Sequence, residues 1–312
     1  MLDTCGREVR TLRLSVTAAC DLRCRYCMSA EGFAQRGAPL SADELVAIAT
    51  AAAKNGINKV RLTGGEPLLR PDIVDICARI AHVEGIRTLA LTTNATRLAA
   101  LAAPLAAAGV SRVNISLDSL DAECYRTLTR GGDIAAVLQG LEAALAAGFA
   151  RVKLNCVLIG GVNDGEIGAF VALTRTKPVD VRFIELMPMG ECAGWPAACF
   201  LSADEVLRRV PELTPLQSEG VAQRYRLPDG LGTVGLIRPM SNAFCGDCDR
   251  IRVTADGMLK PCLHGAEELD LRGLSGAALE ARIALGISGK PAAHHLRDGG
   301  TDTDRGMSQI GG

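Results

Sequence analysis

Ala19-Cys-Asp-Leu-Arg-Cys-Arg-Tyr-Cys-Met28 is the stretch of this sequence that decides the fold. It places three thiols, Cys20, Cys24 and Cys27, so close together that one short loop can wrap them around an iron–sulfur cube. Clusters that only transfer electrons usually take four thiolates. Three ligands therefore leave one iron open, by the logic that keeps one position free in a catalytic metal site. We expect a substrate or cofactor to bind there; a partial zinc site and buried reduced cysteines are the alternatives.

Length, composition and charge set the class of protein. A chain of 312 residues that is 48% hydrophobic can bury the core of one large barrel-type domain and a smaller one. Its formal net charge of −1 argues against an extended nucleic-acid surface and against adsorption to a membrane. The most apolar run, from Leu98 to Val110, is too short for a membrane span, and the N-terminus has no secretory signal. Clustered cysteines without such a signal indicate metal in a reducing compartment, so we expect a cytoplasmic protein.

From residue 11 to residue 189, β-branched runs alternate with amphipathic runs rich in Ala and Leu. This alternation is typical of parallel strands joined by right-handed helical crossovers. Six such units favour an α/β fold built as a partial (β/α)6 barrel over the eight units of a closed barrel. The expected strands lie near 11–17, 59–63, 87–93, 111–117, 151–158 and 180–187, and the expected helices near 41–55, 72–83, 97–108, 133–147, 164–175 and 202–209. The predicted N-caps are Ser41, Asp72, Asp133, Asp164 and Ser202, and the predicted helix ends are Gly56, Gly109 and Gly148.

The alternation of strand and helix patterns ends at about Pro211. Residues 223–226, 232–238 and 250–254 have the pattern of antiparallel strands, with turn signals at 228–230 and 256–257. We therefore divide the chain into a barrel over residues 1–210, a small C-terminal α+β domain over 211–290 that carries a second metal cluster, and a tail over 291–312. Composition alone predicts that the tail, rich in Gly, Asp, Thr and Arg, is disordered.

The second group of clustered cysteines is Cys245, Cys248 and Cys262. Paired C-x2-C spacing is common in closed zinc sites, for which His264 is the only nearby histidine to complete the ligand set. Taken with the first cysteine set, a second three-ligand iron–sulfur cluster is the more economical prediction, and a zinc site is the alternative. Arg250 and Arg252 alternate on one face of the following strand and would face an anion held there. A solvent-exposed strand face is the alternative interpretation.

The two cysteine sets and three further motifs resemble one enzyme family. The further motifs are Leu62-Thr-Gly-Gly-Glu-Pro67, Phe183-Ile-Glu-Leu-Met187 and the terminal Met307-Ser-Gln-Ile-Gly-Gly312. Over nearly its whole length the chain is similar to the GTP 3',8-cyclases of molybdenum-cofactor biosynthesis, in the radical S-adenosylmethionine (SAM) superfamily. The resemblance implies two 4Fe-4S clusters and SAM as cofactors. It also implies that SAM yields a 5'-deoxyadenosyl radical that takes the ribose 3'-hydrogen of GTP, after which the ribose closes onto C8 to give 3',8-cyclo-7,8-dihydro-GTP.

The resemblance also assigns roles to single residues. It places SAM contacts at Tyr26, Gly65, Ser116 and Met187. It places GTP contacts at Arg13, Arg61, Thr92, Lys153, Arg250, Ile251 and Arg252. It brings Gly311 and Gly312 back into the active site, where they would act with Arg250 and Arg252. Cations on strands that face a barrel mouth are costly unless an anion meets them, although each residue taken singly could instead be a salt-bridged strand residue.

The sequence departs from the family pattern at one turn, and alternative functions have to be considered beside the one that the resemblance implies. The family commonly has Gly where this chain has Ala95, so we expect the backbone turn there to differ slightly. The expected partners are a flavodoxin- or ferredoxin-type electron donor and a cyclic pyranopterin monophosphate synthase that receives the product; a homodimer is left open. The alternative enzyme is a peptide- or sulfatase-modifying member of the superfamily. A zinc-binding or electron-transfer protein without turnover would need closed four-ligand sites.

Overall fold

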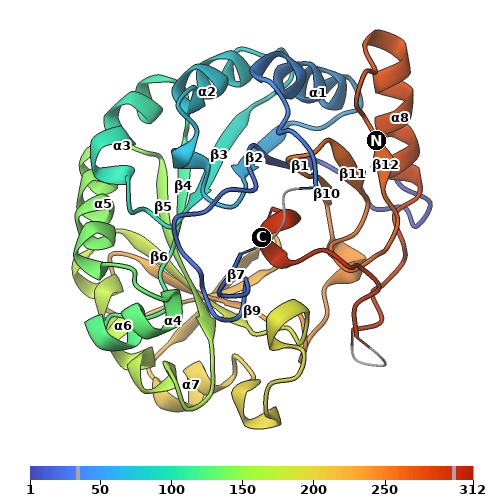
Figure 1. Ribbon diagram of the computed structural model, residues 1–312. Coiled ribbons are helices and arrows are strands. Elements are labelled where there is room, and N and C mark those ends of the chain that lie inside the picture. The colour runs from blue at the N-terminus through green and yellow to red at the C-terminus, as the bar shows by residue number, and fades with distance from the viewer. Residues whose placement is uncertain (33–35, 297–299, 312) are drawn as a thin grey trace.

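The computed structural model describes residues 1–32, 36–296 and 300–311. Six parallel strands in sequence order form the centre of one 12-stranded sheet. They are β1 (Thr11–Ser15), β2 (Lys59–Thr63), β3 (Thr88–Thr93), β4 (Arg112–Ser116), β5 (Arg151–Leu158) and β6 (Val179–Glu185). The sheet curls without closing, and helices cover its outer face (Figure 1). The prediction of a partial (β/α)6 barrel is therefore confirmed.

The crossover helices begin and end close to where the sequence predicts. They are α1 (Ala42–Lys54), α2 (Ile73–Ala81), α3 (Leu98–Ala107), α5 (Ile134–Ala146), α6 (Ile167–Thr176) and the short α7 (Glu205–Arg209). A further helix, α4 (Ala122–Thr129), was not predicted, because its eight residues are polar on average and include Cys and Thr, which are weak helix formers. None of the helices in the described ranges is long and apolar enough to cross a membrane.

The predicted caps are correct where a side chain can reach the first turn. Ser41 and Glu44 form a reciprocal capping box at α1, and Asp133 accepts a bond from the backbone N–H of Ala135 at α5. The N-cap predictions at Asp164 and Ser202 are wrong, since α6 and α7 begin three residues after them. Asp72 occupies the N-cap position of α2 without a side-chain bond. The three glycines predicted to end helices have φ of +88°, +90° and +78°: Gly56, Gly109 and Gly148.

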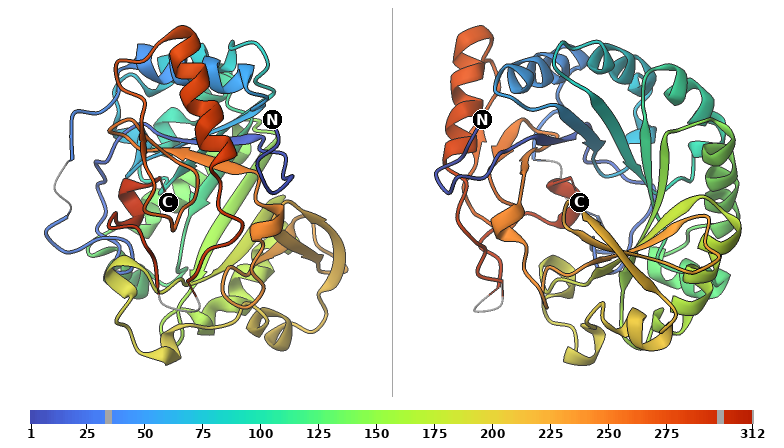
Figure 2. Two further views of the ribbon diagram at one scale, coloured as in Figure 1. Left: turned by 90° about the vertical axis from the view of Figure 1, so that its right-hand side faces the viewer. Right: turned by 180° about the vertical axis from the view of Figure 1, so that it is seen from behind.

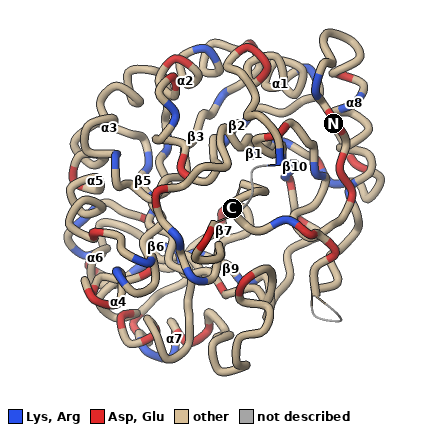
Figure 3. Tube along the Cα trace, in the orientation of Figure 1, with Lys and Arg blue, Asp and Glu red and all other residues tan. Residues whose placement is uncertain are grey.

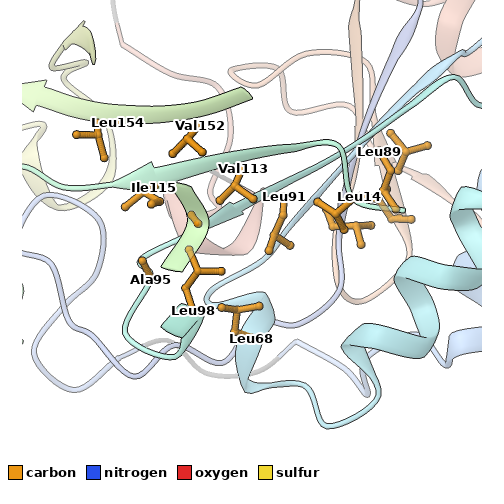
Figure 4. Packing of buried hydrophobic residues seen from close by; sticks show 14 of the residues in the cluster. Leu14, Leu68, Leu89, Leu91, Ala95, Leu98, Val113, Ile115, Val152 and Leu154 are labelled. Carbon is orange, nitrogen blue, oxygen red and sulfur yellow. The ribbon is translucent and has the colours of Figure 1, made fainter. Parts of the chain in front are cut away.

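The strands alternate between an apolar face and a polar face. Leu14, Leu91, Val113, Ile115 and Leu154 point to the outer helices and form the main hydrophobic core (Figure 4). The residues between them on the same strands, including Arg13, Thr92 and Lys153, point into the barrel. Burying the apolar face therefore forces basic and polar side chains onto the inner wall.

The C-terminal strands extend both edges of the same sheet. β9 (Thr233–Ile237) pairs in parallel with β6, and β8 (Ala222–Arg226) and β7 (Thr214–Glu219) follow it outward as antiparallel strands. β10 (Arg250–Val253) pairs in parallel with β1, followed by antiparallel β11 (Met258–Lys260) and β12 (Leu269–Asp270). The antiparallel prediction is confirmed for β8 with β9 and for β10 with β11, whereas the parallel pairings of β9 with β6 and of β10 with β1 were not predicted. The chain has to cross the open side of the barrel between residues 237 and 250, and this crossing carries Cys245 and Cys248.

The last helix and the tail return to the start of the chain and to the barrel. α8 (Gly276–Ser288), which was not predicted, packs against α1. Residues 300–311 are ordered despite their composition, with a 3-10 turn at Met307–Gln309 and a fully buried Ile310. The right-hand view of Figure 2 shows the red Met307–Gln309 turn inside the ring of strands. The division of the chain at residues 210 and 290 stays a prediction.

The turn after β3 makes close contact with α5. Ala95, which stands where the family commonly has glycine, has a left-handed φ of +64°. A Cβ at Gly140 of α5 would lie 2.6 Å from the carbonyl oxygen of Ala95. The turn is therefore left-handed with an alanine, and α5, which packs on it, needs a glycine at position 140.

We expect Gly140→Ala to lower the free energy of unfolding by about 1–3 kcal/mol through overpacking. Gly168→Ala in α6 is the matched control, because a Cβ there meets nothing within 4 Å; it should be neutral or stabilising by up to about 1 kcal/mol. Urea unfolding measures both. Equal midpoints for the two variants would show that α5 does not depend on this close approach.

Candidate active site

A cavity of about 450 Å³ occupies the inside of the barrel. The six cysteines of the two predicted sets all line it: Cys20, Cys24, Cys27, Cys245, Cys248 and Cys262. The other cysteines of the described ranges do not. Residues that are far apart in sequence therefore supply two groups of thiols to one enclosed space, as the sequence predicts.

The first cysteine loop follows β1 and is held by arginines rather than by regular structure. Arg130 donates from Nη1 to the carbonyl oxygens of Arg23, at 2.9 Å, and Met28, at 2.7 Å. Arg23 donates to the carbonyls of Cys20 and Leu22. Saturating the carbonyls in this way fixes the loop backbone and leaves the thiols free to bind.

The chemistry of the first donor set fits an iron–sulfur cluster. Burial raises the pKa of Cys20 to about 11 and that of Cys27 to about 12, so the thiolates need a bound cation to form. Among the described residues, no three His, Cys, Asp or Glu side chains converge closely enough to hold a single metal ion. This geometry disfavours a mononuclear zinc site, whereas a cube binds each thiolate through a different iron.

The Gly-Gly-Glu-Pro turn after β2 packs directly against the cysteine loop. Gly65 donates from its N–H to the carbonyl of Thr17 at 2.7 Å, and Glu66 donates to Ala19 at 2.7 Å. A Cβ at Gly65 would lie only 2.2 Å from the oxygen of Ala19. Glycine is therefore required for contact between the two loops, in addition to the predicted approach of SAM.

Glu66 ties this turn to the end of β3. Its carboxylate accepts bonds from Thr93 Oγ1 and the N–H of Asn94, both at 2.7 Å, and from the N–H of Leu68 at 2.9 Å. Burial nevertheless raises the pKa of Glu66 to about 7. Together with Asp118, whose pKa burial raises to about 6, it places carboxyl groups beside the first thiols, where Arg23 is a nearby cation.

The side chains predicted to contact SAM gather on this part of the cavity wall. Tyr26, Gly65, Ser116 and Met187 all line the cavity. The hydroxyl of Tyr26 donates to Asp118 Oδ2 at 2.8 Å, and its burial raises its pKa well above the usual range. These residues come from different elements and meet only in the folded barrel; their contacts with SAM stay predictions.

Three arginines form a row on neighbouring strands. Arg252 of β10, Arg13 of β1 and Arg61 of β2 are in register and line the cavity. Burial lowers the pKa of Arg61 and of Arg252 to about 10 and that of Arg13 well below its usual value. Repulsion adds to this, chiefly from Arg182 on Arg61, from Arg250 on Arg252 and from Arg252 on Arg13. The Nε atoms of Arg13 and Arg61 are buried without a hydrogen-bond partner. Such a row is costly by itself and favours a bound anion.

A second basic group lies on the opposite wall. Lys153 of β5 is buried, and burial and the charge of Arg182 lower its pKa to about 7. Glu219 at the end of β7 is an acidic centre for this wall, with oxygens 3.7 Å from Lys153 Nζ, 2.5 Å from Arg151 and 3.5 Å from Arg182. Figure 3 shows the Lys and Arg positions on these strands.

Some cavity residues were missed from the sequence. Lys59, Arg112, Arg182 and Glu219 line the cavity. Lys59 shares a strand face with Arg61, and Arg182 alternates with buried Val181 and Phe183, so strand parity could have found both. Glu219 carried no such signal, because it depends on the β7–β8 hairpin crossing to this wall.

The second cysteine set lies in a positive environment. Cys245 and Cys248 precede β10, and Cys262 follows β11. Burial alone would raise the pKa of Cys248, but the charges of Arg250 and Lys290 bring it below its usual value. Arg250 and Arg252 face the cavity, whereas the side chain of Ile251 is in the apolar core, so a GTP contact at Ile251 would use its backbone. Thr92 also lines the cavity, and its Oγ1 has no partner.

The tail reaches the row of arginines. Gly311 is buried with φ of +72°, and its carbonyl accepts a bond from Arg252 Nη1 at 3.1 Å. A Cβ at Gly311 would lie 2.4 Å from Thr63 Oγ1, so a side chain does not fit. The tail therefore reaches Arg252 at Gly311, whereas a role of Gly311 in the reaction stays a prediction; Gly312 lies outside the described residues.

A buried ion-pair group holds the tail in place. The guanidinium of Arg305 bonds both oxygens of Asp256, at 2.9 and 3.0 Å, and both oxygens of Glu268, at 2.5 and 2.7 Å. Lys260 adds bonds to Glu268 and Thr303. These charge-assisted bonds offset the entropy of ordering a glycine-rich end.

We expect Gly311→Ala to unseat the tail, because the added methyl meets Thr63 and a left-handed φ costs a non-glycine residue about 1–2 kcal/mol. Amide exchange of residues 300–311 should rise about tenfold or more, with both iron–sulfur clusters retained. Gly194→Ala, whose Cβ meets nothing within 4 Å, is the control. Unchanged exchange in Gly311→Ala would show that glycine is not needed at this position.

The fold and the paired thiol sets define a radical SAM enzyme with a second cluster region. The family model described as Radical SAM superfamily matches residues 14–174, and the one described as Molybdenum Cofactor Synthesis C matches residues 179–296. Among solved structures, SuiB of Streptococcus suis aligns with a TM-score of 0.63 at 16% identity, covering 93% of this chain and 68% of that one. The structure of anSMEcpe with bound AdoMet aligns at 0.62 and 13%, covering 92% and 82%. These likenesses show the fold alone.

Curated relatives define the family more closely. A GTP 3',8-cyclase of Alkaliphilus oremlandii is 46% identical over 320 residues, covering 100% of both chains. That of Moorella thermoacetica is 45% identical over 325 residues with the same coverage. That of Geobacter sulfurreducens is 48% identical over 280 residues, covering 87% of this chain and 86% of its own. The chain belongs to the GTP 3',8-cyclase family.

Proposed function

We propose that this chain converts GTP to 3',8-cyclo-7,8-dihydro-GTP as the first step of molybdenum-cofactor biosynthesis. The observation that carries the proposal is one cavity lined by both thiol sets and by a row of buried arginines with unpartnered nitrogens. Thiols suit two iron–sulfur clusters, and the arginines suit a triphosphate. Full-length similarity to named GTP 3',8-cyclases supports the same substrate.

The thiols divide between two 4Fe-4S clusters. Cys20, Cys24 and Cys27 would hold the first, beside the SAM-binding residues Tyr26, Gly65, Ser116 and Met187. Cys245, Cys248 and Cys262 would hold the second. When bound, the first cluster and SAM supply the 5'-deoxyadenosyl radical that takes the ribose 3'-hydrogen of GTP. Since the product has the same atoms as GTP, one electron and one proton must return to the nucleotide after the bond to C8 forms.

The residues of this chain would hold the nucleotide and keep water from it. Arg13 and Arg61 neutralise the triphosphate, Thr92 offers its free hydroxyl, and Lys153 adds a charge on the opposite wall. Arg250, the backbone of Ile251 and Arg252 contact the nucleotide near the second thiols. The carbonyl of Gly311 orients Arg252, and a role for Gly312 stays a prediction. Water exclusion protects a carbon radical from side reactions.

The wider setting follows from this chemistry. We place the protein in the cytoplasm, where a flavodoxin- or ferredoxin-type donor supplies electrons and a cyclic pyranopterin monophosphate synthase takes the product. A homodimer stays a prediction, as does the absence of nucleic-acid and membrane partners. The peptide- and sulfatase-modifying alternative has no observation in its favour, because its structural likeness is confined to the fold.

The test is product formation. Protein with reconstituted clusters, SAM, dithionite and GTP should yield the cyclised nucleotide and 5'-deoxyadenosine by LC–MS. Cys24→Ala should abolish both products, because losing one of three thiolates destabilises the first cluster. Cys124→Ala, outside both sets, is the control and should retain them. Turnover of GTP by Cys24→Ala, or none by the intact protein with both clusters loaded, would refute the proposal.

The pH dependence of GTP binding tests Lys153. Its pKa of about 7 means that the free protein loses this charge as pH rises above 7, whereas a bound triphosphate would restore it. The affinity for GTP should therefore fall between pH 7.5 and 9, by at most about tenfold per pH unit for one proton. In Lys153→Met, affinity should be lower and less dependent on pH.

Calorimetry measures this dependence, with Lys177→Met as the control. Lys177 pairs with Glu142 outside the cavity and should leave the pH dependence as it is. Equal pH slopes for wild type and Lys153→Met would show that Lys153 does not meet the phosphates.

A further inference from the structure

Lys290 lies directly behind the second thiol set. It follows α8, is 4% exposed and does not line the cavity. Its ammonium donates to the carbonyl oxygen of Arg250 at 2.8 Å, to that of Pro261 at 3.1 Å and to the sulfur of Cys248 at 3.6 Å. An ammonium has three donors, so all of them are used, and one of them is directed at a cysteine sulfur.

The charge of Lys290 has no carboxylate partner among the described residues. Most buried lysines are paired with an acid, as Lys260 of this chain is with Glu268. Two neutral carbonyls solvate Lys290 without neutralising it. Its natural counter-charge is therefore the thiolate of Cys248 and whatever that thiolate binds.

The N-terminal segment fixes Lys290 in this position. Arg7, paired with Asp3 at 2.6 Å, donates to the carbonyls of Pro291 and Cys245, both at 2.8 Å, and to that of Ala292 at 3.1 Å. One buried arginine thus ties the backbone around Lys290 to the loop of the second thiols. The ammonium is consequently held against Cys248 by the protein and does not depend on substrate.

We propose that Lys290 is a positioning residue that raises the reduction potential of the cluster held by Cys245, Cys248 and Cys262. This rests on the proposed function. Hydrogen bonds to ligand sulfurs, nearby charge and solvent exposure set the potentials of iron–sulfur clusters. A fixed positive charge favours the form with one more electron. The first set has a mixed environment, with the carboxyl groups of Glu66 and Asp118 and the charge of Arg23 nearby, so the two clusters would differ in potential even with like ligands.

The test is a redox titration of the full chain with both clusters reconstituted, followed by EPR. The signal that SAM changes identifies the first cluster, and the other signal the second. Lys290→Met removes the charge and the bonds, and Lys290→Gln removes the charge but keeps a donor. In both, the reduction equilibrium of the second cluster should move at least tenfold toward the oxidised form, about 59 mV for one electron. The first cluster should not change.

Lys54→Met is the matched control, because it removes the same charge from an exposed residue paired with Glu280. It should leave both potentials unchanged. Full iron content in Lys290→Gln together with an unshifted potential of the second cluster would overturn the proposal. This result would not count against the proposed conversion of GTP. Loss of the second cluster from both Lys290 variants would also overturn it, since Lys290 would then hold the ligand loop instead. Failure of the proposed function would appear differently, as intact clusters without GTP turnover in the wild type.

Discussion

Repulsion among buried cations is the constraint on which the rest of the site depends. Arg252, Arg13 and Arg61 are adjacent in a parallel register, so strand pairing itself forces them together. Each lies on the polar face of a strand whose other face is in the core. A change of strand register that moved an arginine out of the cavity would also move the apolar side chains of that strand out of the core. The arrangement of the sheet therefore creates a site for an anion. The carbonyl dipole of Gly311 partly offsets the repulsion among the arginines by accepting a hydrogen bond from Arg252.

The two ends of the cavity have opposite electrostatics. Carboxyl groups lie beside the first thiols, whereas arginines and a lysine lie beside the second. Such a division suits a reaction in which a positively charged sulfonium cofactor and a highly negative nucleotide have to bind in one space without exchanging places. It also separates the chemistry that starts the reaction from the chemistry that holds the substrate.

Local sequence patterns predicted the barrel and most of the site, because strand parity and cysteine spacing are local properties. Arg13, Arg61 and Lys153 were expected from the family resemblance, and strand parity is what places them on the inner wall of the barrel. Glu219 was not, since only the hairpin brings it to Lys153. The parallel pairing of β10 with β1 was also missed, because turn signals show where strands end but not which edge they join. The order of the tail depends on Arg305 meeting Asp256 and Glu268 from distant segments, which composition cannot show.

The placement of β9 on β6 and of β10 on β1 has a consequence for synthesis of the chain. When residues 1–210 have left the ribosome, both outer strands of the nascent sheet still have unpaired backbone groups. Such edges are templates for association with other chains. They stay open until the last third of the protein is made and covers both. A nascent chain of this kind is therefore prone to aggregation until late in translation. A product truncated after residue 210 would keep two edge strands with unpaired backbone groups.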